Sequence, residues 1–337
     1  MSFKRLDAED FLISADSITA GAWTNNSATR TTFFNNSTQL SSDSGRYYYS
    51  VYDSAAGTDV QFNIAYGDSN GSGSVLFNSN IDGKSPTSTV YGQFQNIVLG
   101  DENTDFIFGD FTSSRFYAIT VDRSKFKGNL FPGTMTLTLS GSGVVARTLT
   151  DNSQNASSVS FNEAGRVFQL VSGSAGVVNT TKNANGYVNN SGSYGLFLPD
   201  IGTILLNPYA LDAAINDGGI ALNTTNSIDT KAINTTKLFS AISGGASFTL
   251  NSQENLTSDY VFIRARNSEF NYSSNPSFIS GSTGAVLYDD FINAPQTFIT
   301  TVGLYNDENE LLATAKLSRP LKKDFTKEAL IRVKLDF

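Results

Sequence analysis

The pattern that most constrains the fold lies in the last eight residues, where apolar and charged side chains alternate one for one. The apolar members are Ile331, Val333, Leu335 and Phe337, and the charged members are Arg332, Lys334 and Asp336. Successive side chains point to opposite faces only in an extended strand. A register shift of one residue would bury the charged groups without partners. Leu330–Phe337 is therefore predicted to be a half-buried strand that ties the C-terminus into a sheet.

A β-hairpin is predicted directly before this strand. The runs Thr297–Tyr305 and Glu310–Leu317 are rich in β-branched, aromatic and aliphatic residues, and turn formers fill Asn306–Asn309 between them. Because proline has no backbone N–H to donate, the second strand is expected to stop at Pro320. The basic stretch from Arg319 to Lys327 also contains acids, and we interpret it as a solvated link or an inter-subunit contact.

Short strand-like runs separated by Gly, Asn and Ser turns recur along most of the chain. The predicted strands are Arg46–Tyr52, Asp59–Tyr66, Tyr91–Leu99, Phe106–Phe108, Arg115–Val121, Leu130–Leu139, Val144–Leu149, Arg166–Val171, Ser247–Leu250 and Tyr260–Arg266. Regularly spaced short strands are typical of sandwiches and open barrels. The chain is predicted to be mainly β, with two or more antiparallel β-sandwich or barrel-like domains and a small helical patch.

Helix signals are confined to two segments. Pro208–Ile215 has a proline near its start and Gly218-Gly219 beyond its end, and Lys231–Ile242 precedes Gly244-Gly245. With 337 residues the chain exceeds one ordinary domain. Polar or Gly-rich stretches suggest three parts: an N-terminal β-domain at 1–150, a Gly/Asn/Ser-rich middle region with short helices at 151–245, and a C-terminal β-domain at 246–337.

Two details of the N-terminal part are left open by the pattern. Phe3–Asp16 mixes apolar residues with acids, which fits either a short helix or an extended arm. Trp23, the only tryptophan, lies in a polar setting and is interpreted as a local core anchor rather than a contact residue.

Composition excludes several classes of chemistry. The chain has no His and no Cys, which removes the usual Ser-His and Cys-His nucleophile pairs, disulfides and ordinary zinc sites. A net charge of −8 disfavours binding to a nucleic-acid backbone. Apolar runs stay well short of the ~20 residues that span a bilayer, and the first residues lack the apolar core of a signal peptide. We expect a soluble product made in the cytoplasm, with no nucleic-acid or membrane partner.

Two groups of carboxylates were considered as a catalytic pair: Asp289 with Asp290, and the cluster of Asp101, Glu102 and Asp105. A glycosidase needs two carboxylates that face one cleft, and neighbours in sequence rarely do so. We interpret both groups as solvated turn acids.

Neither the glycines nor the acids form a recognisable ligand motif. Asp68 and Asn70 have the spacing that opens a calcium loop, but Gly71 comes too early and Ser79 stands where the bidentate glutamate belongs. Gly71-Ser72-Gly73 lacks the Lys-Ser/Thr of a phosphate loop. The region is interpreted as a flexible hairpin tip. We predict no catalytic, cofactor-binding or metal-binding residues, and no enzymatic activity.

Several segments resemble a known family. They are Arg264–Pro276, Gln296–Asp307 and Leu311–Lys323, and the segments Tyr91–Leu99 and Leu130–Thr134 are similar to the same family. Together they resemble virion structural proteins of large contractile-tailed phages, especially the T-even-like cyanophages. The resemblance covers about half of the chain, and the Gly/Asn/Ser-rich middle departs from it. It implies a tail or baseplate component located in the virion, in contact with other virion structural proteins and present as a homo-oligomer, without cofactors.

Other functions remain as alternatives. They are a host-surface, glycan-binding fibre or spike module, a capsid or neck decoration protein, and a carbohydrate-active enzyme. Low charge with abundant Tyr and Asn suits both subunit contacts and glycan recognition, so composition does not separate the first of these from a tail component. The closing segment favours assembly, because a receptor binder often has a trimeric tip at its C-terminus, whereas this end is predicted to belong to a sheet.

Overall fold

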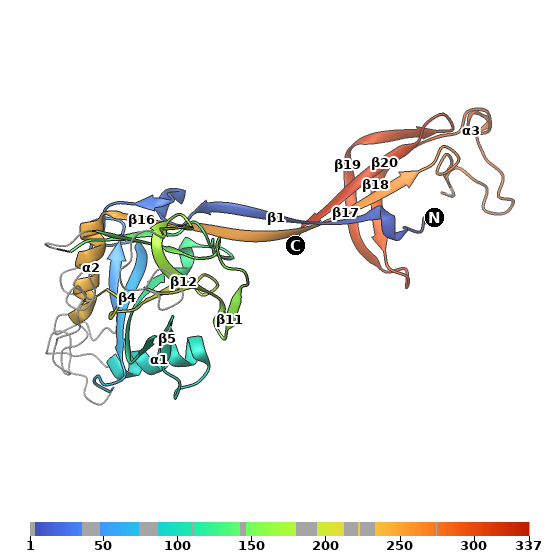
Figure 1. Cartoon of the computed structure of the whole chain (residues 1–337). Helices are drawn as coiled ribbons and strands as arrows, with labels where there is room; N and C mark the ends of the chain where they lie inside the picture. Colours follow the sequence, from blue (N-terminus) through green and yellow to red (C-terminus); the bar gives the residue numbers. More distant parts are fainter. Residues whose placement is uncertain are drawn as a thin grey trace. The chain divides into compact units, whose positions relative to one another are not determined.

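The computed structural model describes residues 4–35, 48–73, 87–109, 111–141, 146–179, 194–211, 222, 233–273 and 275–336. The described chain is mainly β with antiparallel sheets and few helices, as predicted (Figure 1). It divides into two compact units. Unit 1 combines Met1–Ser17 with Asn255–Phe337, and unit 2 is Ile18–Glu254.

This division differs from the three segments expected from the sequence. The expected boundary after residue 150 falls inside strand β10 (Arg147–Asp151), which pairs with β9 (Thr136–Leu139) on one side and β12 (Gly165–Ser174) on the other. The polar stretch after Asp151 is therefore a turn within one sheet. The N-terminal residues join the C-terminal part because β1 (Phe11–Gly21) pairs with β17 (Asn251–Ala265).

Unit 2 is built on one large sheet. Its strand order is β2 (Thr29–Arg30), β16 (Ser247–Thr249), β9, β10, β12, β14 (Gly195–Leu198), β15 (Thr203–Leu206), β7 (Arg115–Val121), β4 (Val60–Asp68) and β3 (Tyr48–Tyr52), with β11 (Ser160–Asn162) and β13 (Val177–Val178) paired to β12. The strands β5 (Phe106–Phe108) and β6 (Phe111–Ser113) form a separate pair, and β8 (Asn129–Leu130) pairs with β17.

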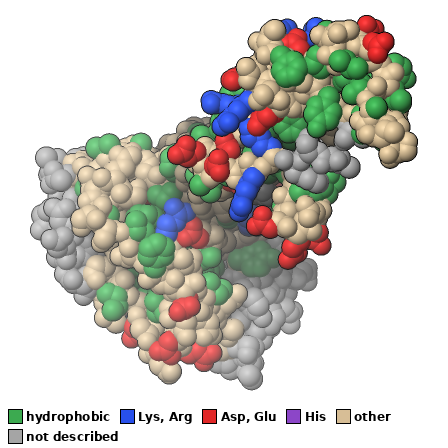
Figure 2. All heavy atoms as spheres, turned by 90° about the vertical axis from the view of Figure 1, so that its right-hand side faces the viewer, with side chains coloured by type: hydrophobic (Ala, Val, Ile, Leu, Met, Phe, Trp, Pro, Cys, Tyr) green, Lys and Arg blue, Asp and Glu red, His purple; other side chains and the backbone are tan. Residues whose placement is uncertain are grey.

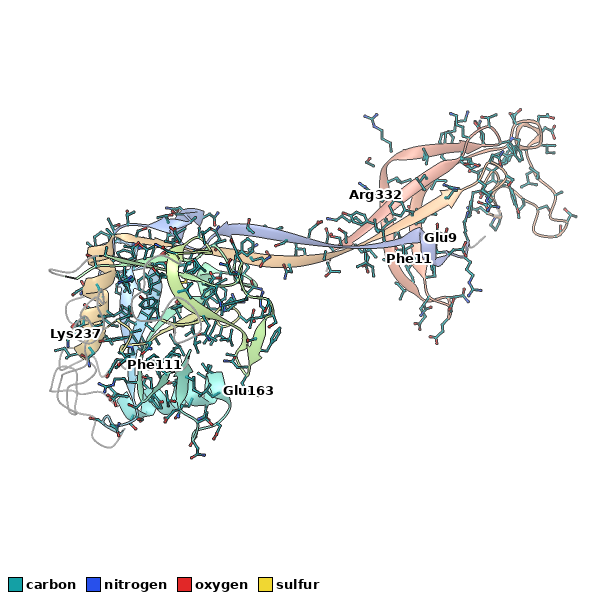
Figure 3. The ribbon with its side chains drawn as sticks, in the orientation of Figure 1. Glu9, Phe11, Phe111, Glu163, Lys237 and Arg332 are labelled. Atoms are coloured by element: carbon teal, nitrogen blue, oxygen red, sulfur yellow. The ribbon has the colours of Figure 1, made fainter. Side chains whose placement is uncertain are left out.

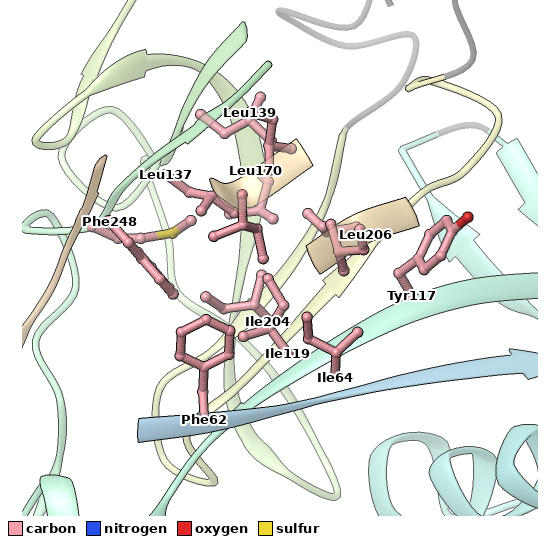
Figure 4. Packing of buried hydrophobic residues seen from close by; sticks show 14 of the residues in the cluster. Phe62, Ile64, Tyr117, Ile119, Leu137, Leu139, Leu170, Ile204, Leu206 and Phe248 are labelled. Carbon is pink, nitrogen blue, oxygen red and sulfur yellow. The ribbon is translucent and has the colours of Figure 1, made fainter. Parts of the chain in front are cut away.

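The large sheet curls until its two ends meet. β16 and β4 stand near opposite ends of the strand order, yet the rings of Phe248 and Phe62 are 5.6 Å apart. At the rim, the Arg30 guanidinium of β2 donates to the Tyr52 carbonyl of β3 at 2.7 Å. The inward side chains of strands from β3 through β16 consequently pack together as one core, part of which is drawn in Figure 4.

Helices complete both faces of this sheet. Helix α2 (Asn234–Gly245) contributes Leu238 and Ile242 to the inner core, which confirms the helix predicted over Lys231–Ile242 for the residues that are described. On the outer face, Phe116 of β7 packs with Tyr91 and other residues in a second cluster. The other predicted helix, Pro208–Ile215, extends beyond the described residues, and Pro208–Leu211 form a turn.

The segment that contains Tyr91 is where the structure differs most clearly from the prediction. Tyr91–Leu99 was predicted as a strand, but it lies in helix α1 (Thr87–Leu99). Its buried residues Val90, Tyr91 and Val98 recur at helical spacing, and this period decides the structure over the β-like composition. Gly100, at φ +69°, ends the helix, and its N–H is directed at the carbonyls of Gln95 and Asn96.

Trp23 anchors the inner core, as predicted. Its side chain is 3% exposed, its ring lies 4.8 Å from that of Phe248 and 5.9 Å from that of Phe62, and its indole N–H donates to the Phe248 carbonyl at 2.9 Å. A buried indole needs such an acceptor.

Unit 1 contains the predicted hairpin and closing strand. The hairpin is β18 (Gln296–Tyr305) with β19 (Leu311–Asp324), and the closing strand is β20 (Ala329–Asp336), paired to β17. Ile331 and Val333 are buried, Leu335 is half-buried, and Arg332, Lys334 and Asp336 are exposed, so the alternation is confirmed; Phe337 lies outside the described residues.

Two other predictions for unit 1 concern the end of β19 and the N-terminal segment. β19 does not stop at Pro320: Ile299 faces Leu321 and Thr301 faces Lys316, so residues 317–320 bulge out opposite a single residue. A proline is tolerated there because the bulged segment donates no ladder hydrogen bond. The N-terminal segment, left open between helix and arm, is a 3-10 turn at Ala8–Asp10 followed by the extended β1.

Candidate interaction surface

The hydrophobic core of unit 1 is small. Its cluster has three buried members, Val261, Ile331 and Val333, at the centre of the β17–β20 pair. The hairpin contributes side chains that are only partly buried, including Val302 and Leu304. Because stability rises with the apolar area removed from water, this unit is weakly stabilised by its own contacts.

Large apolar side chains that the core does not cover remain on the surface of unit 1. They are Phe11, Leu12, Ile13, Tyr272, Val286, Leu287, Tyr288, Ile292, Phe298, Tyr305, Leu311, Leu312, Leu321, Phe325 and Leu330. Figure 2 shows apolar side chains at the surface among acidic and basic groups. Single exposed apolar residues are ordinary, but contiguous ones mark interaction sites.

One such group lies at the end of the β18–β19 hairpin. Tyr305 and Leu311 are register partners, and both side chains lie over Gly303, where an added Cβ would come within 2.8 Å of the Tyr305 ring and 3.3 Å of Leu311 Cδ1. A register shift beside this pair leaves Leu312 as an extra residue that is 68% exposed. The glycine therefore lets two apolar side chains lie flat against the strand.

The turn that follows is fixed by hydrogen bonds. The Asn306 side-chain oxygen accepts from the N–H groups of Glu308 at 3.1 Å and Glu310 at 2.7 Å, and its amide donates to Glu310 Oε2 at 3.0 Å. Asp307 and Glu308 are exposed, and no Lys or Arg among the described residues pairs with them. We refer to Tyr305, Leu311 and Leu312, together with the acids Asp307, Glu308 and Glu310, as the hairpin tip.

A second group lies on the face of the β17–β20 pair that points away from the core. Leu330 faces Arg264, Arg332 faces Phe262, and Lys334 faces Tyr260 across the pair. Directly opposed residues of an antiparallel pair share one face, and every second residue joins them. The six residues Arg264, Arg332, Lys334, Tyr260, Phe262 and Leu330 are here named the basic strip.

The cations of this strip differ in their partners. The Arg332 guanidinium lies 5.5 Å and the Lys334 ammonium 5.9 Å from the Tyr260 ring centroid (Figure 3 labels Arg332). Lys334 is also ion-paired with Asp336 at 2.8 Å, and the hydrogen bond that its ammonium donates to this carboxylate raises the pKa of Lys334. Among the described residues, no carboxylate lies within ion-pair distance of Arg264 or Arg332.

One lysine of the stretch interpreted as a solvated link is buried instead. The Lys323 ammonium is 0% exposed and donates to the Asn267 carbonyl at 3.1 Å, to Asn271 Oδ1 at 2.8 Å and to the Asp324 carbonyl at 3.1 Å. All of its donors are used, which is what allows an ammonium group to be buried. Through these hydrogen bonds Lys323 connects the loop after β17 to strand β19, so its role is structural.

The acids considered for catalysis lie in turns or at a helix start. Asp289 and Asp290 open the short helix α3 (Asp289–Asn293) and are exposed. The hydroxyl of Thr104 and the N–H of Asn103 donate to Asp101 and lower the pKa of its carboxyl. Asp105 accepts from the Tyr91 hydroxyl at 3.1 Å. Burial is the main reason that the pKa of Tyr91 rises to about 12.

Neither ligand motif weighed in the sequence assembles a metal site. Asp68 is buried and accepts from the Tyr66 hydroxyl at 3.1 Å and from the Asn70 N–H at 2.9 Å, so it fixes the turn after β4; Ser79 lies outside the described residues. In the part of the chain that the structure describes, no three acidic side chains gather where they would hold a cation.

Comparisons of the chain with protein-family models, curated proteins and solved structures give no match. No helix among the described residues is long and apolar enough to cross a membrane.

Proposed function

We propose that this chain is a structural component of a contractile phage virion, in the tail or baseplate, where it joins other subunits through unit 1. The observation that carries the proposal is the contrast between the small buried core of unit 1 and the apolar side chains that it leaves exposed. A permanent assembly covers such side chains with a neighbouring subunit, as the core of an obligate interface does.

The strands of unit 1 support the same role. Among the described strands, β18 and β19 pair only with each other, so each has one edge without a partner strand, and β20 is the outer strand of its own sheet. Free strand edges offer backbone donors and acceptors to another chain, and monomeric proteins usually cover or interrupt them. The family resemblance of Gln296–Asp307 and Leu311–Lys323, which make up most of this hairpin, names the kind of assembly.

The proposal is tested on purified particles. Mass spectrometry should find the chain in stoichiometric amounts, and labelling with an antibody against unit 2 should place it on the tail or baseplate in electron micrographs. A variant with Leu311→Ser and Leu312→Ser should be depleted from particles. Val177→Ser is the matched control, because Val177 is a similarly exposed apolar residue of unit 2. Particles that lack the wild-type chain would refute the proposal.

A further inference from the structure

We propose that the hairpin tip of one copy of this chain docks on the basic strip of a second copy. The inference deepens the proposed function and rests on it, because it names the first partner of the same unit 1 surface. It begins from two charged groups of opposite sign on one unit. Both groups contain charges that no described residue neutralises.

The charges of the two surfaces are complementary. The hairpin tip presents Asp307, Glu308 and Glu310, which have no cation partner among the described residues. In the basic strip, Lys334 is ion-paired with Asp336, and the negative charge of Asp16 also raises the pKa of Lys334. The guanidinium groups of Arg264 and Arg332 are therefore the charges that no described carboxylate compensates. Opposed charges of this kind select the partner and speed its association.

The apolar parts are complementary as well. The tip carries the exposed Leu311 and Leu312 beside Tyr305. The strip exposes 62% of Leu330 and the half-buried rings of Tyr260 and Phe262. Aromatic and aliphatic side chains at the centre with charges around them are the usual anatomy of a protein interface.

The tip of the same copy cannot cover its own strip. The hairpin packs through Val302 and Leu304 against the cluster that contains Val261 and Val333. The strip lies on the opposite face of those strands, since its members alternate with the core residues along β17 and β20. The occupant must be another molecule. A second copy carries a tip of the required charge and shape.

Each copy offers one tip and one strip, so two copies either exchange them reciprocally in a two-fold dimer or associate head-to-tail. A head-to-tail contact produces a ring when the rotation closes and a filament when it does not. The paired surfaces are small, and the affinity of one contact is expected on the order of micromolar, which suits subunits that meet at high local concentration.

Sedimentation velocity on the full chain, from about 1 to 200 µM and at low and high salt, tests the contact. The wild type should associate, and association should weaken as salt rises. Glu308→Lys with Glu310→Lys should weaken it at least ~10-fold. The matched control is Asp289→Lys with Asp290→Lys, an exposed acidic pair of unit 1 outside both surfaces, which should associate like the wild type.

A mixing experiment identifies the partner surface. Arg264→Glu with Arg332→Glu should also abolish association, but this variant mixed with the tip-reversed variant should assemble, because each then meets a surface of opposite charge. Unchanged circular dichroism, together with wild-type resistance of unit 1 to limited proteolysis, would show that the variants fold.

Three results would overturn the inference: a wild type that stays monomeric throughout the concentration range, reversals without effect, or a monomer whose strip binds labelled DNA and loses it in the Arg→Glu variant. A monomer that is still found in particles would leave the proposed function standing. A chain that associates as predicted but is missing from particles would refute only the function.

Discussion

Units 1 and 2 use the same kind of strand for opposite purposes. In unit 2 a single sheet curls on itself, and α1 and α2 pack on its two faces, so that β14 and β15 are buried along their whole length. In unit 1 the strands bury one face, and the hairpin buries it only in part. Unit 2 is the longer unit, yet among the residues that the structure describes more of the exposed large apolar side chains belong to unit 1.

This contrast shows where each unit obtains its stability. Burial of apolar area is the main stabilising contribution to a fold, and a sheet that curls around its own core achieves it without help. Unit 1 has a small core and open strand edges, so part of its stabilisation has to come from apolar area that a neighbouring molecule buries. Unit 2 is therefore a self-sufficient scaffold, and we infer that unit 1 is completed by assembly.

The largest expected loss of stability comes from a substitution in the core of unit 2. Phe62→Ala removes a side chain that is 0% exposed and packs against Trp23 and Phe248, so it should reduce the free energy of unfolding of unit 2 by about 3–5 kcal/mol. Urea denaturation followed by the fluorescence of Trp23 measures this unit alone. A loss below about 1 kcal/mol would mean that the curled sheet is not closed around these rings.

The buried ammonium of unit 1 gives the next effect. Lys323→Met leaves the Asn271 amide and two carbonyls without their donor, and should cost about 2–3 kcal/mol. Faster hydrogen exchange at residues 267–273 would report the loss. Lys322→Met is the matched control, because Lys322 is largely exposed and its 3.8 Å ion pair with Asp324 contributes less than about 0.5 kcal/mol. Equal effects of both substitutions would contradict the structural role of Lys323.

The closing strand should respond to its alternation, but less than a closed core would. Leu335 is half-buried, so Leu335→Asp should destabilise unit 1 by roughly 1–2 kcal/mol, whereas Lys334→Ser changes an exposed residue and should have much less effect. Limited proteolysis of unit 1 ranks the two variants. If Lys334→Ser proved the more damaging, the assignment of faces along β20 would be wrong.

A carboxylate of unit 2 gives a smaller effect than Leu335→Asp, together with a pH signature. Burial alone would raise the pKa of Asp200, but hydrogen bonds from the Arg166 side chain and N–H, at 2.5 to 3.2 Å, outweigh it and lower the pKa. This contribution is present above the unfolded pKa and is lost as pH falls through the lower folded pKa. Because the pair is partly exposed, Asp200→Asn should cost about 1 kcal/mol at neutral pH. A difference that persists unchanged below pH ~2 would contradict this linkage.

Local patterns carried most of what the sequence could predict. The hairpin and β20 depend on neighbours a few residues apart. The bounds predicted for β18 and β20 were nearly correct, whereas β19 runs to Asp324 instead of ending at Leu317. The error at Tyr91–Leu99 arose because Val, Tyr and Phe favour strands, whereas burial at Val90, Tyr91 and Val98 follows the helical period. Pro320 was misjudged because a bulge depends on the partner strand.

Long-range pairing was hidden from the sequence. Nothing near Phe11 indicates that β1 pairs with β17, so the composition of unit 1 from both ends of the chain was missed. The basic strip could not be predicted for the same reason, since Arg264 and Arg332 are brought together only by the register of β17 with β20. The alternation of β20 did predict that Arg332 and Lys334 are exposed, and this was the available signal.

Hydrogen exchange tests the contrast between the two units most directly. Backbone amides of β18 and β19 would be followed in the dilute chain and in assembled particles, with β4 and β7 of unit 2 as the internal reference. Our account predicts fast exchange in the hairpin of the dilute chain, strong slowing on assembly, and no change in β4 and β7. A hairpin that is already as protected as β4 in the dilute chain would contradict the claim that unit 1 is completed by its neighbours.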